Sequence, residues 1–223
     1  MNDINYRGLS IPFIRMGEGS VTSDNLFDPN EQVIFDFYEA NRGRYQRAID
    51  IGANIGVHSI LMARAGWEVR AYEPDPVHFE HLQDNLIDNR AAVALHNVAV
   101  SNHIGTALFA RIIDNTPGSH LLCAKESYGP REYLKVPTVD CRELFAWAEF
   151  AKIDCEGHEA VLMQTTTAET WRTLDAMMEV GSVANARMIY ERLEGIVPMW
   201  SQKTDWGRVA GLPDMPAHHS EGS

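Results

Sequence analysis

Ionisable side chains crowd into one short segment of the sequence, from Lys152 to Glu159. Its eight residues, Lys-Ile-Asp-Cys-Glu-Gly-His-Glu, include five ionisable side chains besides the cysteine. A buried acid beside a histidine can shift either pKa toward neutrality and so create a proton acceptor. We therefore expect Asp154, Glu156 and His158 to be catalytic, with His158 as the general base. The acids could instead only stabilise the start of the following helix through its dipole.

A second candidate for chemistry is the glycine-containing segment Asp50-Ile51-Gly52-Ala53-Asn54-Ile55-Gly56. A strand that ends in Gly-x-x-x-Gly and turns into a helix lets the backbone approach a ligand closely, since neither glycine has a side chain. A dinucleotide-binding turn has the pattern G-x-G-x-x-G, whereas Asn54 would crowd a pyrophosphate. The turn therefore favours a nucleoside that carries an amino acid. Asp50 could bind its ammonium group or anchor the turn, and the amides after Gly52 could bind its carboxylate.

Two further segments supply groups that a nucleoside needs. Glu73 follows Gly52 at the spacing of roughly 20 residues that is typical of a ribose-binding acid. Asn97 and Val98 would offer an adenine ring a polar partner and an apolar wall. Simpler interpretations remain open, because the glycines could only allow close packing, Glu73 could be a surface acid, and Asn97 could only cap a turn.

Alternating strands and helices would position all of these residues. Short apolar runs predict strands, and segments with helical periodicity follow several of them; the runs lie at 48–52, 68–72, 93–100, 150–153 and 175–180. Such βαβ units imply a Rossmann-like α/β sandwich with a mostly parallel sheet, helices on both faces and a ligand beyond the carboxyl ends of the strands. Lys152 alternates with Ile153 in its strand and could be a surface residue.

The chain is predicted to form one domain. Residues 1–30 are predicted as an irregular lead-in, 31–219 as a single domain, and about 105–139 as an inserted hairpin or lid. Asp140 and Glu143 have the spacing of a capping box and predict a helix start. Three polar residues of the insertion could touch an acceptor, but we interpret them as solvated turn residues: Asn115, Ser119 and His120.

Composition narrows the class of protein. The 223 residues carry a net charge of −12, which disfavours nucleic acid as a partner because nucleic-acid binders usually present a basic face. The three cysteines form no C-x-x-C pair, so neither a disulfide framework nor a zinc site is predicted. No run of ~18 apolar residues occurs, so we expect a cytoplasmic protein that does not span a membrane.

The residues above match a known family. The sequence resembles the FkbM-type S-adenosylmethionine-dependent methyltransferases in four segments: Asp50 to Gly56, Glu73-Pro74, Asn97 to Ser101 with Gly105 after it, and Lys152 to Glu159. The resemblance implies a seven-stranded, mostly parallel sheet with a reversed final strand and S-adenosylmethionine as the cofactor. It also implies O-methylation of a hydroxyl on a small metabolite, a sugar or a polyketide-like acceptor.

Carried over residue by residue, the resemblance also implies binding roles. It places Asp50, Gly52, Asn54 and Gly56 around the methionine part, Glu73 on the ribose, Asn97 and Val98 near adenine, and Asp154 near the reactive methyl. No metal is predicted, because Asp154 and Glu156 are too few ligands to define a metal site. Two alternatives stay open: an NAD-dependent oxidoreductase on a similar fold, and a non-catalytic nucleoside-binding module.

Overall fold

A parallel sheet of five strands forms the centre of the protein, whose computed structural model describes residues 3–122, 124 and 129–216. The strand order is β11 (Asp175–Met178), β10 (Phe150–Ile153), β3 (Arg47–Ile51), β4 (Glu68–Tyr72) and β5 (Val93–His96). All neighbours in this order are parallel. The inner strands are apolar and buried on both faces, as expected of a parallel sheet covered by helices. The chain therefore has the predicted α/β architecture, with a parallel sheet and flanking helices.

The expectation of seven strands with a reversed final strand is not confirmed in the described part of the chain. After β11 the chain forms α6 (Val183–Leu193) and then a separate antiparallel pair, β12 (Trp200–Ser201) and β13 (Gly207–Arg208). Glycines and prolines interrupt residues 195–213, and such residues weaken or end strands. The two short strands pair with each other and not with the central sheet.

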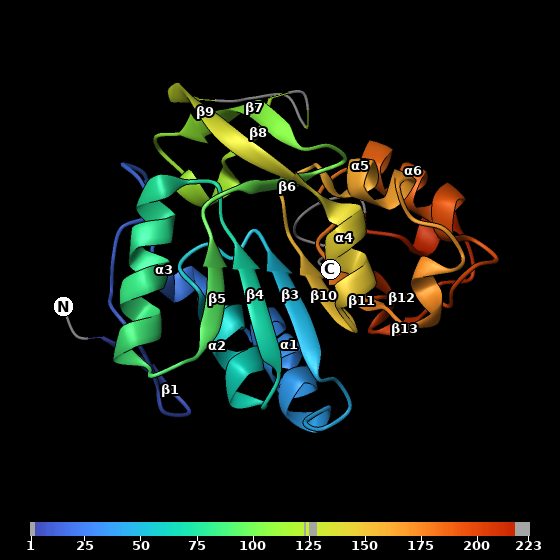
Figure 1. Cartoon of the computed structure of the whole chain (residues 1–223), viewed down its shortest axis with the longest axis horizontal. Helices are drawn as coiled ribbons and strands as arrows, with labels where there is room; N and C mark the ends of the chain where they lie inside the picture. The colour runs from blue at the N-terminus through green and yellow to red at the C-terminus, as the bar shows by residue number, and fades with distance from the viewer. Residues whose placement is uncertain (1–2, 123, 125–128, 217–223) are drawn as a thin grey trace.

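A second sheet lies beyond the carboxyl ends of β3, β4 and β5 (Figure 1). Its order is β6 (Ala99–Ser101), β9 (Arg131–Asp140), β7 (Gly105–Ile112) and β8 (His120–Leu121). The long strands β7 and β9 pair antiparallel from Gly105↔Thr138 to Ile112↔Arg131. The strand predicted over residues 93–100 is thus two strands in different sheets, because the chain turns at 97–98.

Helices flank the central sheet. They are α1 (Pro29–Ala40), α2 (Val57–Arg64), α3 (Pro76–Asp88), α4 (Cys141–Trp147) and α5 (Glu159–Gln164), besides α6; α1 and α2 lie behind the sheet in Figure 1, and α4 lies in front of it. Asp28, Asp75 and Asp140 accept backbone hydrogen bonds at the N-caps of α1, α3 and α4. The helix start predicted at Asp140 is therefore confirmed.

The first 30 residues contain more regular structure than predicted. Strands β1 (Ile4–Tyr6) and β2 (Leu9–Ile11) form an antiparallel hairpin whose Leu9 and Ile11 are fully buried in the core. Residues 16–19 then contact the loop that follows β7. The amides of Glu18 and Gly19 donate to the carbonyls of residues 113 and 114, and the amide of residue 116 donates to the Met16 carbonyl. The lead-in therefore supports this loop.

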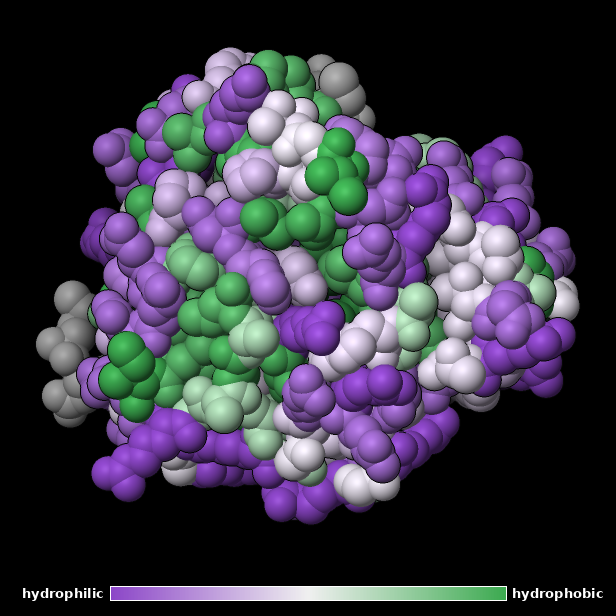
Figure 2. Space-filling model, in the orientation of Figure 1, coloured by the Kyte–Doolittle hydropathy of each residue, from purple (hydrophilic) through white to green (hydrophobic). Residues whose placement is uncertain are grey.

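The surface is polar with local apolar areas. Figure 2 shows apolar side chains gathered over β4 and β5 between α3 and α4, and again over the second sheet. Ile87, Ile104 and Tyr133 are among the exposed large apolar side chains. No helix in the described ranges is both long enough and apolar enough to cross a bilayer.

Candidate active site

The five central strands end level with one another. Ile51 pairs with Tyr72 and with Ile153, Tyr72 pairs with His96, and Ile153 pairs with Met178. The polar residues that follow these ends therefore meet at one edge of the sheet: Gly52, Glu73, Asn97, Asp154 and Glu179. Sequence analysis identified four of these five residues and missed Glu179, although it directly follows β11.

Gly52 occupies the point where the loops after β3 and β10 approach most closely. Its φ of 76° is left-handed, and a Cβ there would overlap the carbonyl oxygen of Asp154. Gly56 has a φ of 94°, and a Cβ there would overlap the side chain of Leu82. Asn54, between them, is also left-handed at 51°. The two glycines therefore allow the turn to pack closely against the loop after β10 and against α3, as in the simpler interpretation of the sequence.

Lys152 is the counter-ion of two acids at this edge. Its ammonium donates to Asp154 Oδ2 at 3.1 Å and to the Gly52 carbonyl at 3.3 Å, and lies 3.8 Å from Asp50 Oδ1. Burial lowers its pKa, but the charges of Asp154, Asp50 and Glu31 outweigh burial and raise the pKa above the ordinary value. The interpretation of Lys152 as a surface residue is wrong: it is 8% exposed, because β10 is covered on both faces.

Asp50 is fully buried at the end of β3. Its Oδ2 accepts a hydrogen bond from the Ser59 hydroxyl at 2.6 Å. Its Oδ1 has no hydrogen-bond partner among the described residues and faces the ammonium of Lys152. Asp50 therefore joins β3, the start of α2 and Lys152, which fits the predicted role of anchoring the turn.

Glu73 connects two loops through one carboxylate. Its Oε2 accepts a hydrogen bond from the backbone N–H of Asn54, and its Oε1 accepts one from the backbone N–H of Asp75, both at 2.8 Å. Burial raises the pKa of Glu73 to about 8, although both backbone hydrogen bonds lower it. Glu73 is only 5% exposed, so it is no surface acid. Each carboxyl oxygen keeps a further hydrogen-bonding position, which a pair of ribose hydroxyls could use.

This raised pKa predicts a pH-dependent stability. A carboxyl whose pKa is higher in the folded state stabilises the fold below its unfolded pKa of about 4.3, and this contribution is lost as the pH rises toward 8. Glu73→Gln should therefore flatten the fall in the free energy of unfolding between pH 4 and pH 8, measured by urea denaturation. The exposed Glu80→Gln on α3 is the control. An unchanged slope in Glu73→Gln would refute the assigned pKa.

Asn97 forms hydrogen bonds with the backbone of the turn after β4. Its amide nitrogen donates to the Glu73 carbonyl at 2.8 Å and to the Pro74 carbonyl at 3.4 Å. Val98 packs against the buried residues on the other side of the sheet. Neither side chain lines the pocket at the sheet edge. Asn97 therefore caps the turn after β4, as in the simpler interpretation of the sequence.

A pocket of about 500 Å³, open to solvent, lies between the sheet edge and the second sheet. One side is formed by residues that follow the central strands, among them Gly52, Glu73, Asp154 and Glu156. The other side is formed by the second sheet and its loop, among them Phe109, Thr116, Ser119, His120 and Leu121. The interpretation of Ser119 and His120 as solvated is wrong, since they are 7% and 1% exposed.

A backbone hydrogen bond orients His120 in this pocket. Its Nδ1 lies 3.0 Å from the Gly118 carbonyl oxygen. A carbonyl oxygen only accepts hydrogen bonds, so Nδ1 carries a proton and donates to this carbonyl. His120 was among the residues that could touch an acceptor, but no local pattern predicts its burial, because the loop packs through tertiary contacts such as the one between His78 Nε2 and Thr116 Oγ1 at 2.8 Å.

The structure does not bring His158 into the pocket. It stands at the N-cap of α5, and its Nε2 lies 3.1 Å from the Ser101 hydroxyl on β6. Burial, together with the charge of His103, lowers the pKa of His158 to about 4. The imidazole is therefore neutral at physiological pH and engaged with the second sheet.

Glu159 holds the loop that presents Glu156. Its buried carboxylate accepts from the amides of Cys155 at 2.9 Å and Gly157 at 3.0 Å, and from the Asn185 side chain at 2.7 Å. Glu156, between them, has a left-handed φ of 54°, which is uncommon for a residue other than glycine, asparagine or aspartate. Such strain persists only where the surroundings fix it, and here Glu159 does so.

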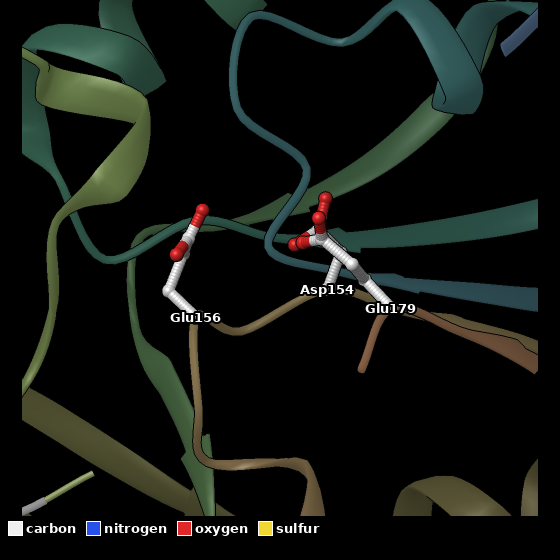
Figure 3. Close-up of side chains that lie close together, drawn as sticks. All are labelled: Asp154, Glu156 and Glu179. Atoms are coloured by element: carbon white, nitrogen blue, oxygen red, sulfur yellow. The ribbon is translucent and has the colours of Figure 1, made fainter. Parts of the chain in front are cut away.

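Asp154, Glu156 and Glu179 bring carboxylate oxygens within 4.8 Å of one another, from the loops after β10 and β11 (Figure 3). Burial and the charge of Asp154 raise the pKa of Glu179 well above its ordinary value. Burial raises the pKa of Asp154 as well, but Lys152 and a hydrogen bond from Glu179 lower it to about 2. Glu179 is therefore protonated and donates to an ionised Asp154. The proton on Glu179 and the positive charge of Lys152 thus neutralise the carboxyl groups of Glu179 and Asp154.

Comparison with known proteins identifies the family. A family model described as the methyltransferase FkbM domain matches residues 50–188, well over half of the chain. The chain belongs to the FkbM methyltransferase family. The resemblance seen in the sequence is thereby confirmed, and the cofactor of this FkbM methyltransferase is S-adenosylmethionine.

Solved structures of other methyltransferases are similar at low identity. A SAM-dependent methyltransferase from Agrobacterium tumefaciens is 10% identical with a TM-score of 0.44, over 75% of this chain and 51% of that one. Precorrin-6y C5,15-methyltransferase from Geobacter metallireducens GS-15 is 15% identical with a TM-score of 0.45, over 82% and 77%. The N-terminal domain of human METTL16 is 17% identical with a TM-score of 0.46, over 83% of this chain and 66% of that one. The FkbM methyltransferase thus spans about half of the Agrobacterium enzyme. No curated protein sequence matches it.

Proposed function

We propose that this FkbM methyltransferase transfers a methyl group to a hydroxyl oxygen of a small acceptor, such as a sugar, a polyketide-like compound or another metabolite. The observation that supports this is the pocket of about 500 Å³ between the sheet edge and the second sheet. It combines apolar walls such as Phe109 and Leu121 with the carboxylate of Glu156, which can accept a proton. The net charge of −12 further favours a small acceptor over nucleic acid.

The residues at the sheet edge fit the cofactor. The turn from Gly52 to Gly56, with Asn54 between the two glycines and Asp50 at its start, would hold the methionine part. Glu73 would form hydrogen bonds with the ribose hydroxyls. Asn97 would shape the wall near adenine by fixing the turn after β4, and Val98, the next residue, would add apolar surface there. S-adenosylmethionine supplies an electrophilic methyl group on its sulfonium. Asp154, which the protein keeps ionised, would lie near that methyl.

The acceptor hydroxyl must lose its proton as its oxygen forms the new bond to carbon and the bond between carbon and sulfur breaks. Glu156 lines the pocket, whereas His158 does not. We therefore assign the proton to the carboxylate of Glu156, and we assign His158 the role of joining the loop after β10 to Ser101. Alignment of the two reactants supplies much of the remaining rate enhancement in such transfers.

Glu156→Gln should lower the rate of methyl transfer by roughly 10²- to 10⁴-fold, the range for loss of a general base. Binding of S-adenosylhomocysteine, measured by calorimetry, should stay unchanged. The exposed Glu143→Gln on α4 serves as the matched control, and His158→Asn should cost less than Glu156→Gln. A Glu156→Gln protein with full activity would exclude the assignment.

The proposed function is tested by incubating the protein with methyl-labelled cofactor and a fractionated extract of the source cells. We expect one labelled small molecule whose new methyl group is bonded to oxygen, as shown by NMR of the purified product. A methyl group on nitrogen or carbon, or a labelled macromolecule, would contradict the proposal. Tight binding of S-adenosylhomocysteine without any labelled product would favour the non-catalytic module. The family assignment decides against the NAD-dependent oxidoreductase.

A further inference from the structure

Arg111 links the second sheet to the turn that carries Glu73. It lies two residues after Phe109 on β7, so both side chains project from the same face of the strand. Phe109 lines the pocket, whereas Arg111 reaches the start of α3, where its Nε donates to Asp75 Oδ2 at 2.7 Å. Its Nη1 donates to Oε1 of Glu132, the residue opposite on β9, at 3.0 Å. One guanidinium therefore joins both long strands of the second sheet to α3.

Asp75 depends on this arginine for its charge balance. The residue is fully buried, and its Oδ1 caps α3 by accepting from the backbone N–H groups of Val77 and His78. Its Oδ2 accepts from Arg111, and no other ion pair of Asp75 forms among the described residues. Burial lowers the pKa of Arg111, but the hydrogen bond and charge of Asp75 outweigh burial and raise it. Because a buried carboxylate without a counter-ion is costly, the ion pair holds Asp75 in place.

Asp75 in turn fixes one oxygen of Glu73. The backbone N–H of Asp75 donates to Glu73 Oε1, while the backbone N–H of Asn54 donates to Oε2. The glycine turn thus orients one oxygen of this carboxyl group, and Asp75 orients the other. Neither Arg111 nor Asp75 is among the described residues that line the pocket. A displacement of Asp75 would therefore reach a ligand in the pocket by turning the carboxyl group of Glu73.

We propose that Arg111 is a positioning residue for the cofactor: through Asp75 it orients the carboxyl group of Glu73 toward the two ribose hydroxyls. A strand of the second sheet thereby contributes to the affinity for S-adenosylmethionine and S-adenosylhomocysteine. The inference rests on the placement of the ribose at Glu73 proposed above. It is independent of the acceptor and of the atom that receives the methyl group.

Two ligands that differ in the ribose provide the test. Calorimetry should show S-adenosylhomocysteine binding to Arg111→Met about tenfold more weakly than to the unmodified protein, the equivalent of one to two hydrogen bonds between neutral groups. Its dideoxy analogue, whose ribose lacks both hydroxyl groups, should bind both proteins equally, because Glu73 then has no hydroxyl to meet. Arg131→Met, at an exposed position of β9, is the matched control and should change neither affinity. Equal weakening of both ligands, or no weakening of either, would overturn the proposal.

A double-mutant cycle covers the case in which Arg111→Met fails to fold. Asp75→Ser keeps one oxygen to cap α3 and removes the buried charge, so Arg111→Met in this background leaves no buried carboxylate without a counter-ion. The double variant should show the same loss of about tenfold, again only for the ligand with ribose hydroxyls. Because Arg111 acts through Asp75, Asp75→Ser alone should show this loss already. Full affinity of the double variant for S-adenosylhomocysteine would refute the proposal.

The placement of the ribose is tested separately with Glu73→Ala. This variant should weaken binding of S-adenosylhomocysteine and leave binding of the dideoxy analogue unchanged. If Glu73→Ala has this selective effect and Arg111→Met does not, the ribose placement stands and the positioning role is refuted. If the unmodified protein binds both ligands equally, the placement fails and the positioning role fails with it. Failure of the proposed O-methylation would appear differently, as a product methylated elsewhere than on oxygen, with these affinity differences intact.

Discussion

Alanine in place of Gly52 is expected to abolish S-adenosylhomocysteine binding and to destabilise the fold by about 2–5 kcal/mol. The left-handed conformation alone costs about 1–2 kcal/mol for a residue with a Cβ. The new methyl group would also overlap the Asp154 carbonyl, and relief of such overpacking typically costs about 1–3 kcal/mol. The loops after β3 and β10 would have to separate, which would disturb the pocket that they line at the sheet edge. Urea denaturation and calorimetry would measure the two effects.

Gly43→Ala is a control that separates the cost of the left-handed conformation from the cost of steric overlap. Gly43 has a φ of 84°, but a Cβ there would meet no atom within 4 Å. The free energy of unfolding of this control should fall only by the conformational cost of about 1–2 kcal/mol. Its affinity for S-adenosylhomocysteine should stay unchanged. If Gly52→Ala lost no more stability than Gly43→Ala and still bound S-adenosylhomocysteine, the close approach of the two loops would have no functional importance.

Lys152→Met should cost about 3–5 kcal/mol of stability, because removal of one partner leaves buried charges uncompensated. Asp50 is fully buried, and both Asp50 and Asp154 face this ammonium. The loss should depend on pH. Lys152 lowers the pKa of Asp154, so its contribution is present above the unfolded pKa of about 3.9 and disappears as the pH falls toward 2. The deficit of the variant should therefore shrink in acid, as measured by urea denaturation from pH 7 to pH 3.

Lys135→Met, on an exposed position of β9, is the matched control. It removes the same charge and adds the same side chain without uncovering a buried acid, so it should change stability by less than about 0.5 kcal/mol. A loss below about 1 kcal/mol in Lys152→Met would contradict the assignment, because the buried Asp50 and the partly buried Asp154 would then tolerate the absence of their counter-ion.

The sequence allowed the sheet edge to be predicted because βαβ alternation dictates it. Apolar runs located β3, β4 and β10, and parallel pairing requires that their carboxyl ends meet. Gly52, Glu73 and Asp154 could therefore be placed together before any coordinates were considered. The burial of Lys152 was missed, although a parallel sheet with helices on both faces leaves no open face for the alternating side chains of an inner strand.

The remaining site residues depend on tertiary contacts that a local pattern does not contain. Glu179 joins Asp154 through the register of β10 and β11. His120 enters the pocket because its loop folds back between the second sheet and the sheet edge. His158 lies outside because Glu159, one residue later, binds the amides of the preceding loop and turns the chain toward β6.

The contact between residues 16–19 and the loop after β7 has an evolutionary consequence. That loop forms one wall of the pocket at the sheet edge, and part of its support comes from the lead-in, far in sequence from the residues on the opposite wall. Substitutions among residues 16–19 can therefore reshape one wall while Gly52 and Glu73 stay in place. Under the proposed function, acceptor choice and cofactor binding would therefore change through substitutions in different parts of the chain.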